Sequence, residues 1–479
     1  MKNSVLKKCL IIMLMIQMGL LFQGPSFAED NTADIEKRLN DLEQQVADLK
    51  QELWQQKQDK AKGSGNVVVT ANNKDGFAIK SADGNYTLKV GGYTQVVARE
   101  FADNKKDLGY GSSIIPRRVR LIIQGTVAHD FDFFIQPDFG YTNTYSSITA
   151  TAPTAYAVGL QDAWLDWKYL PWATIKAGKF KTPFDLENLQ DTRYTAFTEI
   201  GLTGNLSPQR DVGVQISGSL FDDSINYAGG IFDGAADKEN NYGGWATPPG
   251  DTNEKSGTGR VFFKPFKKLS IEPLQGLGIG YAASYGKVKG TDLPNYVTPG
   301  QAPIFSYNSG VSAAGPQIRN SPQAFYYYKS LGILGEKVES QEELEYTSGS
   351  HIYRDKPTNK AWEVTGSYVL TGEDASYNGV TPRNDFDISS GHWGAFELVS
   401  RYGELKLDGS IFSEGFANLN TSISKENTWG TGINWYLNHN VKLAADFEQT
   451  KFRRGAVNGV STDDRKTENL FTGLAQLSF

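Results

Sequence analysis

The last ten residues of the chain, Leu470–Phe479, read LFTGLAQLSF. Counting back in twos from the terminal Phe479, one side of an extended segment carries Leu477, Ala475, Gly473 and Phe471. Because side chains alternate between the two faces of a β-strand, this spacing predicts a strand with one apolar face. A closing strand that ends on a bare aromatic residue is typical of transmembrane β-barrels, in which the outward face meets lipid. A soluble β-sandwich is the alternative that the alternation allows.

The same alternation extends back from this strand to about residue 77. Segments of roughly ten residues place apolar side chains at every second position, as in Tyr86–Val97, Gly394–Tyr402 and Asn440–Glu448. Short connections alternate with long polar ones, the long ones lying near 101–115, 141–156, 180–209, 234–256, 289–321, 404–425 and 451–466. The sequence therefore predicts an all-β fold, a transmembrane antiparallel β-barrel of about 16 strands within residues 63–479. One connection, 372–391, falls where a short turn is expected and is long.

Residues 1–28 have the features of a secretory signal peptide. Lys2, Lys7 and Lys8 form a basic start, Leu10–Phe22 is apolar, and Ser26-Phe27-Ala28 is a small-x-small cleavage site. The one cysteine, Cys9, lies inside this leader, so the mature chain is expected to contain neither disulfides nor thiolate metal sites. No later stretch is long and apolar enough to be a transmembrane helix.

Residues 29–62 predict a helical segment followed by a linker. Apolar residues recur with the spacing 4-3-4-3-4, at Ile35, Leu39, Leu42, Val46, Leu49 and Leu53. This heptad seam predicts a short periplasmic coiled coil between identical chains, and Gly63-Ser64-Gly65 ends it. A single amphipathic helix lying on a neighbour is the alternative.

Composition and charge exclude several classes of function. Loss of the leader lysines takes the net charge from −6 to about −9, which argues against a nucleic-acid partner. The four histidines fall in or beside expected turns and loops, at His129, His351, His392 and His439. No catalytic triad or metal-ligand spacing accompanies them, so we expect neither an enzyme nor a cofactor or metal site.

The stretch RRVRLIIQG, Arg117–Gly125, indicates what the barrel interior is for. Its residues divide between two faces, with Val119, Leu121 and Ile123 toward lipid and Arg118, Arg120 and Gln124 toward the lumen. This phase is required because a charge facing lipid at mid-depth costs about 2–4 kcal/mol. Ile122 is the apolar exception on the inner face, and Arg117, beside Pro116, is expected near the extracellular rim. The arginines favour an anion path over a merely solvated wall.

A second basic cluster lies at residues 174–184. Lys176 shares the lumen face with Thr174, and the strand then breaks into the long loop 180–209. If this loop folds inward, Lys179 and Lys181 are expected near the constriction. Asp162, on the preceding strand, is expected to face the lumen and either pin a basic side chain or balance charge.

At this point the sequence resembles a known family, the phosphate-selective porins O and P of Gram-negative bacteria. The resemblance spans about residues 77–479 and rests on RRxRL at 117–121 with Gly125, Asp138-Phe139, KAGKFKTPFDLE at 176–187, RDVG at 210–213, YVLTGE at 368–373, WGAFELVSRY at 393–402 and GINWYL at 432–437. It implies a sixteen-stranded trimeric barrel in the outer membrane, with basic residues that guide phosphate to a narrow site.

Carried over by position, the resemblance assigns Arg117, Arg118, Lys176 and Asp162 to the pore lining. Two positions depart from the family pattern: Arg120 stands where a pore-facing tyrosine can occur, and Tyr93 where a central arginine can occur. The resemblance also implies that the assembly machinery for outer-membrane barrels reads Phe479.

We therefore expect an outer-membrane porin that forms a water-filled, anion-preferring channel for phosphate or similar small anions. Its expected partners are these anions, outer-membrane lipid, two further copies in a homotrimer, and peptidoglycan through the coiled coil. A general small-solute porin remains an alternative. So does a barrel whose main role is to attach the outer membrane to the cell wall.

Overall fold

A computed structural model describes residues 67–72, 76–102, 112–140, 158–170, 172–238, 254–291, 293–348, 350–456 and 463–479, with a few isolated positions between 44 and 55. The chain divides into two units, Met1–Asn66 and Val67–Phe479. The expected signal peptide lies outside the described residues. So does most of the expected coiled coil, although the isolated positions that are described there are helical. No described helix is long and apolar enough to cross a membrane.

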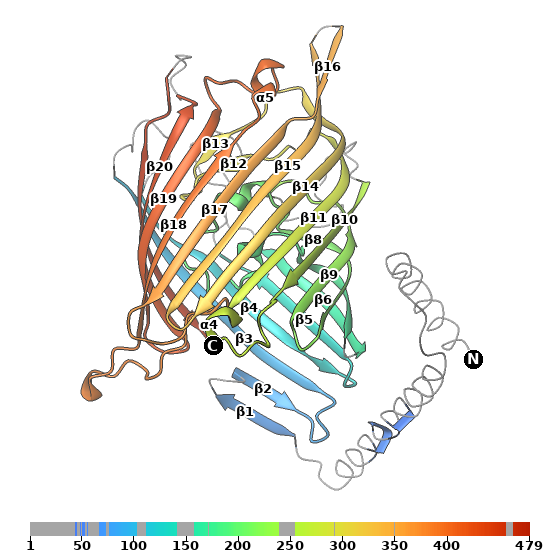
Figure 1. Ribbon diagram of the computed structural model, residues 1–479, viewed down its shortest axis with the longest axis vertical. Coiled ribbons are helices and arrows are strands. Elements are labelled where there is room, and N and C mark those ends of the chain that lie inside the picture. The colour runs from blue at the N-terminus through green and yellow to red at the C-terminus, as the bar shows by residue number, and fades with distance from the viewer. Residues whose placement is uncertain are drawn as a thin grey trace. The chain divides into compact units, whose positions relative to one another are not determined.

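Sixteen antiparallel strands form a closed barrel, as predicted (Figure 1). Each strand pairs with the next along the chain, and the last strand pairs with the first, with Leu477 opposite Thr94. The strands of the barrel are β3 (Thr87–Phe101), β4 (Ser113–Val127), β5 (Phe131–Asp138), β6 (Gly159–Leu170), β7 (Ala173–Lys181), β8 (Arg210–Leu220), β9 (Ile225–Phe232), β10 (Glu254–Phe263), β11 (Leu277–Gly290), β14 (Val311–Tyr328), β15 (Leu331–Ser348), β17 (Thr358–Val369), β18 (Ala395–Lys406), β19 (Ile423–Tyr436), β20 (Val441–Arg454) and β21 (Glu468–Ser478).

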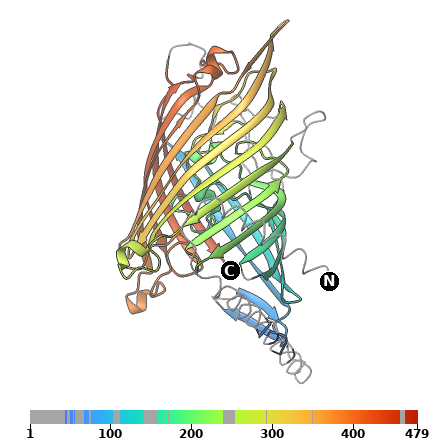
Figure 2. The same ribbon diagram turned by 45° about the vertical axis from the view of Figure 1, so that its right-hand side comes forward.

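Short strands and helices lie at the two ends of the barrel. A hairpin of β1 (Val68–Asn72) and β2 (Gly76–Lys80) pairs onto the start of β3, and β16 (His351–Asp355) pairs onto the end of β15. The connections hold β12 (Tyr296–Val297), β13 (Pro303–Phe305), the short helices α3 (Leu186–Leu189), α4 (Glu272–Gln275) and α5 (Ser410–Ser413), and the 3-10 turns η1 (Leu202–Leu206) and η2 (Ile388–Ser390). Long loops gather at one end, and the C-terminus lies at the other (Figure 2).

The closing strand β21 has the two faces that its sequence predicts. Phe471, Leu477 and Phe479 point outward and are 51%, 55% and 49% exposed. Gln476 and Ser478 point inward and are buried. The backbone N–H of Phe479 donates to the carbonyl of Gly92, and Gly92 donates back, both at 3.0 Å. The terminal residue therefore completes the seam between the last strand and the first.

The start of β4 differs from the sequence prediction. Strand β4 begins at Ser113, so Arg117 lies within it rather than at its entry. The pairing of β4 with β3 shifts register between Gln95–Arg118 and Val96–Pro116, which leaves Arg117 as the extra residue of a bulge. A bulge re-aims the side chain that it carries. Adjacent residues of a regular strand point to opposite faces, but the bulge lets the guanidinium groups of both Arg117 and Arg118 turn inward.

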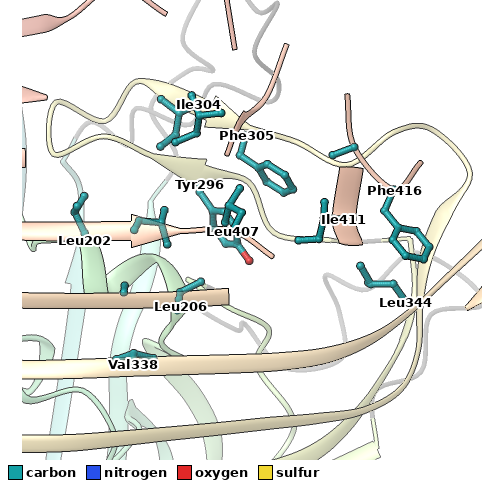
Figure 3. Packing of buried hydrophobic residues seen from close by; sticks show 14 of the residues in the cluster. Leu202, Leu206, Tyr296, Ile304, Phe305, Val338, Leu344, Leu407, Ile411 and Phe416 are labelled. Carbon is teal, nitrogen blue, oxygen red and sulfur yellow. The ribbon is translucent and has the colours of Figure 1, made fainter. Parts of the chain in front are cut away.

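Loops from the long-loop end pack their apolar side chains together (Figure 3). The inward loop, residues 182–209, contributes Leu202 and Leu206 to a buried apolar cluster. Tyr296, Ile304 and Phe305 from the loop that follows β11 pack into the same cluster, as do residues after β18. This core includes Val338 and Leu344 of β15, so it lies against the wall that β15 and its neighbours form.

Part of the long connection 370–394 packs into the other end of the barrel. Ala375 and Val380 are buried beside Tyr327 and Tyr436 at the mouth. The hydroxyl of Tyr377 donates to the carbonyl of Leu186 at 2.5 Å, and the side-chain amide of Gln190 donates to the carbonyl of Tyr377 at 2.8 Å. Residues 373–380 therefore reach the inward loop from the side of the short turns.

Candidate solute path through the barrel

Three arginines meet one carboxylate where the inward loop touches the barrel wall. Glu199 of the inward loop accepts from Arg117 Nε at 2.6 Å, Arg118 Nη2 at 2.9 Å and Arg99 Nη2 at 3.1 Å. Burial raises the pKa of the Glu199 carboxyl, but the guanidinium groups of Arg117, Arg118 and Arg99 outweigh it and hold this pKa well below its usual range. The cluster thus carries three positive charges and one negative charge.

Arg120 has a separate partner deeper in the barrel. Its Nε donates to Asp138 at 2.7 Å, and its Nη1 donates to the hydroxyl of Tyr93 at 2.7 Å. The Tyr93 hydroxyl also lies 2.6 Å from the hydroxyl of Thr192 in the inward loop. This chain of contacts joins β5, β4, β3 and the inward loop.

A cavity of about 380 Å³ lies between the inward loop and the wall of β3–β10. Its basic lining residues outnumber its acidic ones, Arg120, Lys176, Lys181, Arg210 and Arg260 against Asp162 and Asp191. The remaining lining residues are Tyr93, Phe134, Gln136, Trp164, Phe180, Pro183, Leu189, Thr192, Gln215 and Ala228.

Like Arg120, two more of the five basic residues, Arg210 and Lys176, have carboxylate partners on the barrel wall. Arg210 Nε donates to Asp162 at 3.1 Å. Lys176 Nζ lies 3.6 Å from Asp166 and 3.7 Å from the centre of the Trp164 ring. The Trp164 ring stacks in turn on Phe134, at 5.2 Å between ring centres. Asp162 therefore pins an arginine, one of the two roles expected of it.

The other two basic residues bond to neutral groups. Lys181 Nζ donates to the backbone carbonyl of Gln190 at 2.5 Å, and Arg260 Nε donates to the side-chain oxygen of Gln323 at 2.8 Å. Within the described part of the chain, neither cation forms an ion pair. Lys181 and Arg260 are therefore the basic residues of the cavity lining that have no carboxylate partner in the described part of the chain.

The structure brings together most of the residues singled out in the sequence. Tyr93, Arg120, Asp162, Lys176 and Lys181 line the cavity. Arg117 and Arg118 lie in the cluster around Glu199. Lys179 does not line the cavity, because its amine donates to the carbonyl of Leu160 at 2.9 Å. Gly178, with φ of 130°, precedes it.

Sequence reasoning missed Arg99, Glu199, Arg210 and Arg260 as parts of this site. Arg210 was visible in the RDVG motif, and Arg260 alternates with the outward Val261 and Phe263, which would have placed it inward. Nothing local marked Glu199, since its role depends on a loop that folds back across the lumen. No group of three or more His, Cys, Asp or Glu in the described residues could hold a metal ion.

Comparison with known proteins identifies the group to which this barrel belongs. Residues 84–254 and 323–479 match the family model of the phosphate-selective porins O and P. The chain belongs to this family. Membership makes it a porin of the bacterial outer membrane, a channel rather than an enzyme.

Individual relatives are distant. The porin is similar to Porin O of Pseudomonas aeruginosa, with 23% identity over 417 residues that cover 80% of this chain and 87% of the relative. Its fold is similar to the outer membrane channel DcaP of Acinetobacter baumannii, with a TM-score of 0.50 and 11% identity. That match covers 82% of this chain and 98% of DcaP.

Proposed function

We propose that this porin forms a water-filled, anion-preferring diffusion channel for phosphate and similar small anions. The observation that carries the proposal is the excess of cations along the cavity between the inward loop and β3–β10. Five basic and two acidic side chains line it. Lys181 and Arg260 hydrogen-bond to neutral acceptors rather than to a carboxylate.

Local charges decide selectivity because the chain as a whole is acidic. A positive charge close to an ion in a narrow channel attracts it with on the order of 1 kcal/mol or more when the effective dielectric constant is below that of water. Acidic residues on outer loops act across water and are screened over roughly 8–10 Å. A narrow passage with low-dielectric walls also focuses the field of its lining residues.

The remaining features of the proposal rest on the sequence and on family membership. Residues 1–28 are removed on export, and residues 29–62 form a coiled coil in the periplasm of a Gram-negative cell that reaches peptidoglycan. Residues 63–479 form the barrel, which assembles as a homotrimer. The barrel assembly machinery reads Phe479. Arg117, Arg118, Arg120, Lys176, Lys179, Lys181, Asp162 and Tyr93 belong to the anion path.

Bilayer conductance in a KCl gradient tests this function. We expect the purified protein to pass chloride in preference to potassium, and added phosphate to reduce the chloride current by competition. Replacing both Lys181 and Arg260 by Gln should shift the reversal potential toward the cation side. Arg354→Gln on the exposed strand β16 is the matched control, since it removes one basic charge far from the cavity.

The other outcomes of this measurement distinguish the alternatives. Equal permeability to chloride and potassium, unchanged in the double variant, would mean a general small-solute porin. A folded barrel that passes no current would favour a structural role at the cell wall. Either result contradicts an anion channel.

A further inference from the structure

The long periplasmic connection has a second half that leaves the lumen. Residues 373–380 are the part that reaches the inward loop. Residues 385–393, which we call the foot, turn back outside the barrel before β18 begins. The connection hangs below the barrel wall in orange (Figures 1 and 2).

The foot is a closed turn. Asp387 and His392 exchange two backbone hydrogen bonds, both at 3.0 Å. The Asp387 carboxylate accepts from the Ser389 N–H at 2.9 Å, and from the hydroxyls of Ser389 at 2.7 Å and Ser390 at 2.6 Å. Gly391, with φ of 72°, takes the left-handed conformation that reverses the chain. These bonds hold η2 at the tip in one conformation.

Aromatic packing fixes the foot against the outer wall of the barrel. The Phe386 ring lies 5.3 Å from Trp435 and 5.9 Å from Trp393. Trp435 stacks on Phe396 at 5.4 Å and donates its indole N–H to the carbonyl of Trp393 at 2.7 Å.

These wall residues belong to the face of the barrel that meets lipid. Phe396 shares a strand face with the exposed Leu398, and Trp435 shares one with the exposed Ile433. Glu397 and Asn434, which lie between the members of these pairs, point inward and are buried. Phe396 and Trp435 lie at the periplasmic ends of β18 and β19, where transmembrane barrels carry a girdle of aromatic residues. The foot therefore continues the lipid-facing surface at its periplasmic edge.

Two apolar side chains of the foot are exposed. Ile388, at the tip, is 74% exposed, and Trp393 is 57% exposed. Trp is enriched at membrane–water interfaces because its ring is apolar and its N–H is polar. Residues 385–393 contain no Lys or Arg, so attraction to anionic lipid does not contribute.

We propose that the foot is a lipid-binding element that inserts Ile388 and Trp393 into the periplasmic leaflet of the outer membrane. Its partner is the phospholipid surface itself, at the boundary between headgroups and acyl chains. Insertion covers the exposed isoleucine, and it ties one edge of the connection to the membrane while residues 373–380 of the same connection touch the inward loop. The proposal does not depend on which solute the porin passes.

Site-specific labelling tests the proposal on the full chain with Cys9→Ser. Ile388→Cys carries an environment-sensitive fluorophore, and the labelled protein is reconstituted into phosphatidylethanolamine and phosphatidylglycerol vesicles. Some of the lipids bear nitroxide quenchers at shallow or deep positions. Ile433→Cys, on the lipid-facing wall, is the positive control. Ala82→Cys, in the exposed turn between β2 and β3, is the aqueous control.

We expect the label at position 388 to be quenched by shallow nitroxide lipids, to within about twofold of the label at 433, and to resist aqueous iodide. Because Asp385 and Asp387 are acidic, quenching should not increase with the fraction of anionic lipid. A label at 388 that behaves like the one at 82 would overturn the proposal. Self-quenching between copies in detergent, without quenching by nitroxide lipids, would assign the foot to a second copy of the chain instead.

Discussion

Glu199 sets the net charge of the arginine cluster at the inward loop. It is one carboxylate among Arg99, Arg117 and Arg118, all within 3.1 Å. The sequence drew attention to Arg117 and Arg118 and assigned all of their charge to the pore. The structure shows that part of that charge is cancelled by a loop residue. A substitution at an arginine therefore also leaves a buried carboxylate with fewer partners, which is costly in itself.

A charge series separates these effects. We expect Glu199→Gln to raise anion preference and Arg118→Gln to lower it, each by on the order of 1 kcal/mol, roughly fivefold in permeability ratio. The double variant restores the wild-type charge of the cluster, so its reversal potential should lie near that of the wild type. The measurement is the reversal potential in a salt gradient, at low salt where screening is weakest. Identical values for all four proteins would exclude the cluster from the path.

Arg120 belongs to a different contact, and its variant should behave differently. In Arg120→Gln, Asp138 loses the donor at 2.7 Å, and Tyr93 loses one of its two bonds. We expect lower anion preference together with a lower melting temperature, because a buried ion pair that loses one partner destabilises the fold by about 3–5 kcal/mol. The double variant with Asp138→Asn should recover most of the stability but not the selectivity. Thermal unfolding followed by β-sheet circular dichroism measures the first, and bilayer recordings the second.

The inward loop is the element that crosses the lumen between two walls of the barrel. Carboxylates on the opposite wall hold it by its backbone. Glu336 accepts from the N–H groups of Leu186 and Glu187 at 2.9 and 3.0 Å, and Glu363 accepts from the N–H of Leu202 at 3.0 Å. Arg401 donates to the carbonyl of Glu199 at 2.8 Å. Side chains on β15, β17 and β18 therefore set the position of a loop that begins after β7.

Removing one of these acceptors should loosen the loop. In Glu336→Leu the N–H groups of Leu186 and Glu187 lose their acceptor inside the barrel, at a cost of about 1–3 kcal/mol for each group left unpaired. We expect a barrel that still folds, with higher single-channel current noise and a lower melting temperature. Glu336→Gln keeps one acceptor oxygen and should be intermediate. Glu339→Gln on the same strand, where Lys337 and Lys360 are the partners, is the control. Noise equal to wild type in the Leu variant would show that other contacts hold the loop.

At the scale of the whole molecule, the closing seam decides whether a barrel exists. Phe479 bonds to Gly92 through both of its backbone groups, and its ring meets Phe77 at 6.4 Å between centres. Gly92 has no room for a side chain, because a Cβ there would lie 2.4 Å from the carbonyl oxygen of Arg120. Phe479 thus packs against residues of β2 and β3 at the seam.

Deletion of Phe479 should reduce the amount of folded barrel in the outer membrane while export across the inner membrane continues. The physical reason is the loss of the seam bonds together with the aromatic signal that the assembly machinery is proposed to read. The measurement is the fraction that resists unfolding on an unheated gel, with Phe471→Ala as the control for a lost outward aromatic on β21. A normal folded fraction after deletion would contradict both parts of this reasoning.

The division of the chain at Asn66–Val67 leads to a prediction about assembly. A chain without residues 29–62 should still form conducting trimers, because the barrel walls rather than a marginal short helix hold the copies together. Chemical cross-linking and conductance check this. Monomeric barrels from the shortened chain would show instead that the helical segment holds the trimer.

The alternation of apolar and polar residues in the sequence was sufficient to predict the barrel itself. Side chains that alternate at every second residue can satisfy lipid on one face and water on the other in only one register, so the number of strands, their faces and the closing role of Leu470–Phe479 followed from local pattern. The inward phase of Arg118, Arg120 and Lys176 followed in the same way. Tertiary structure alone decided what these charges meet. Glu199, Glu336, Arg401 and the two halves of the connection 370–394 act through loops that fold across the lumen or over the wall, and contacts between residues so far apart in sequence leave no periodic signal.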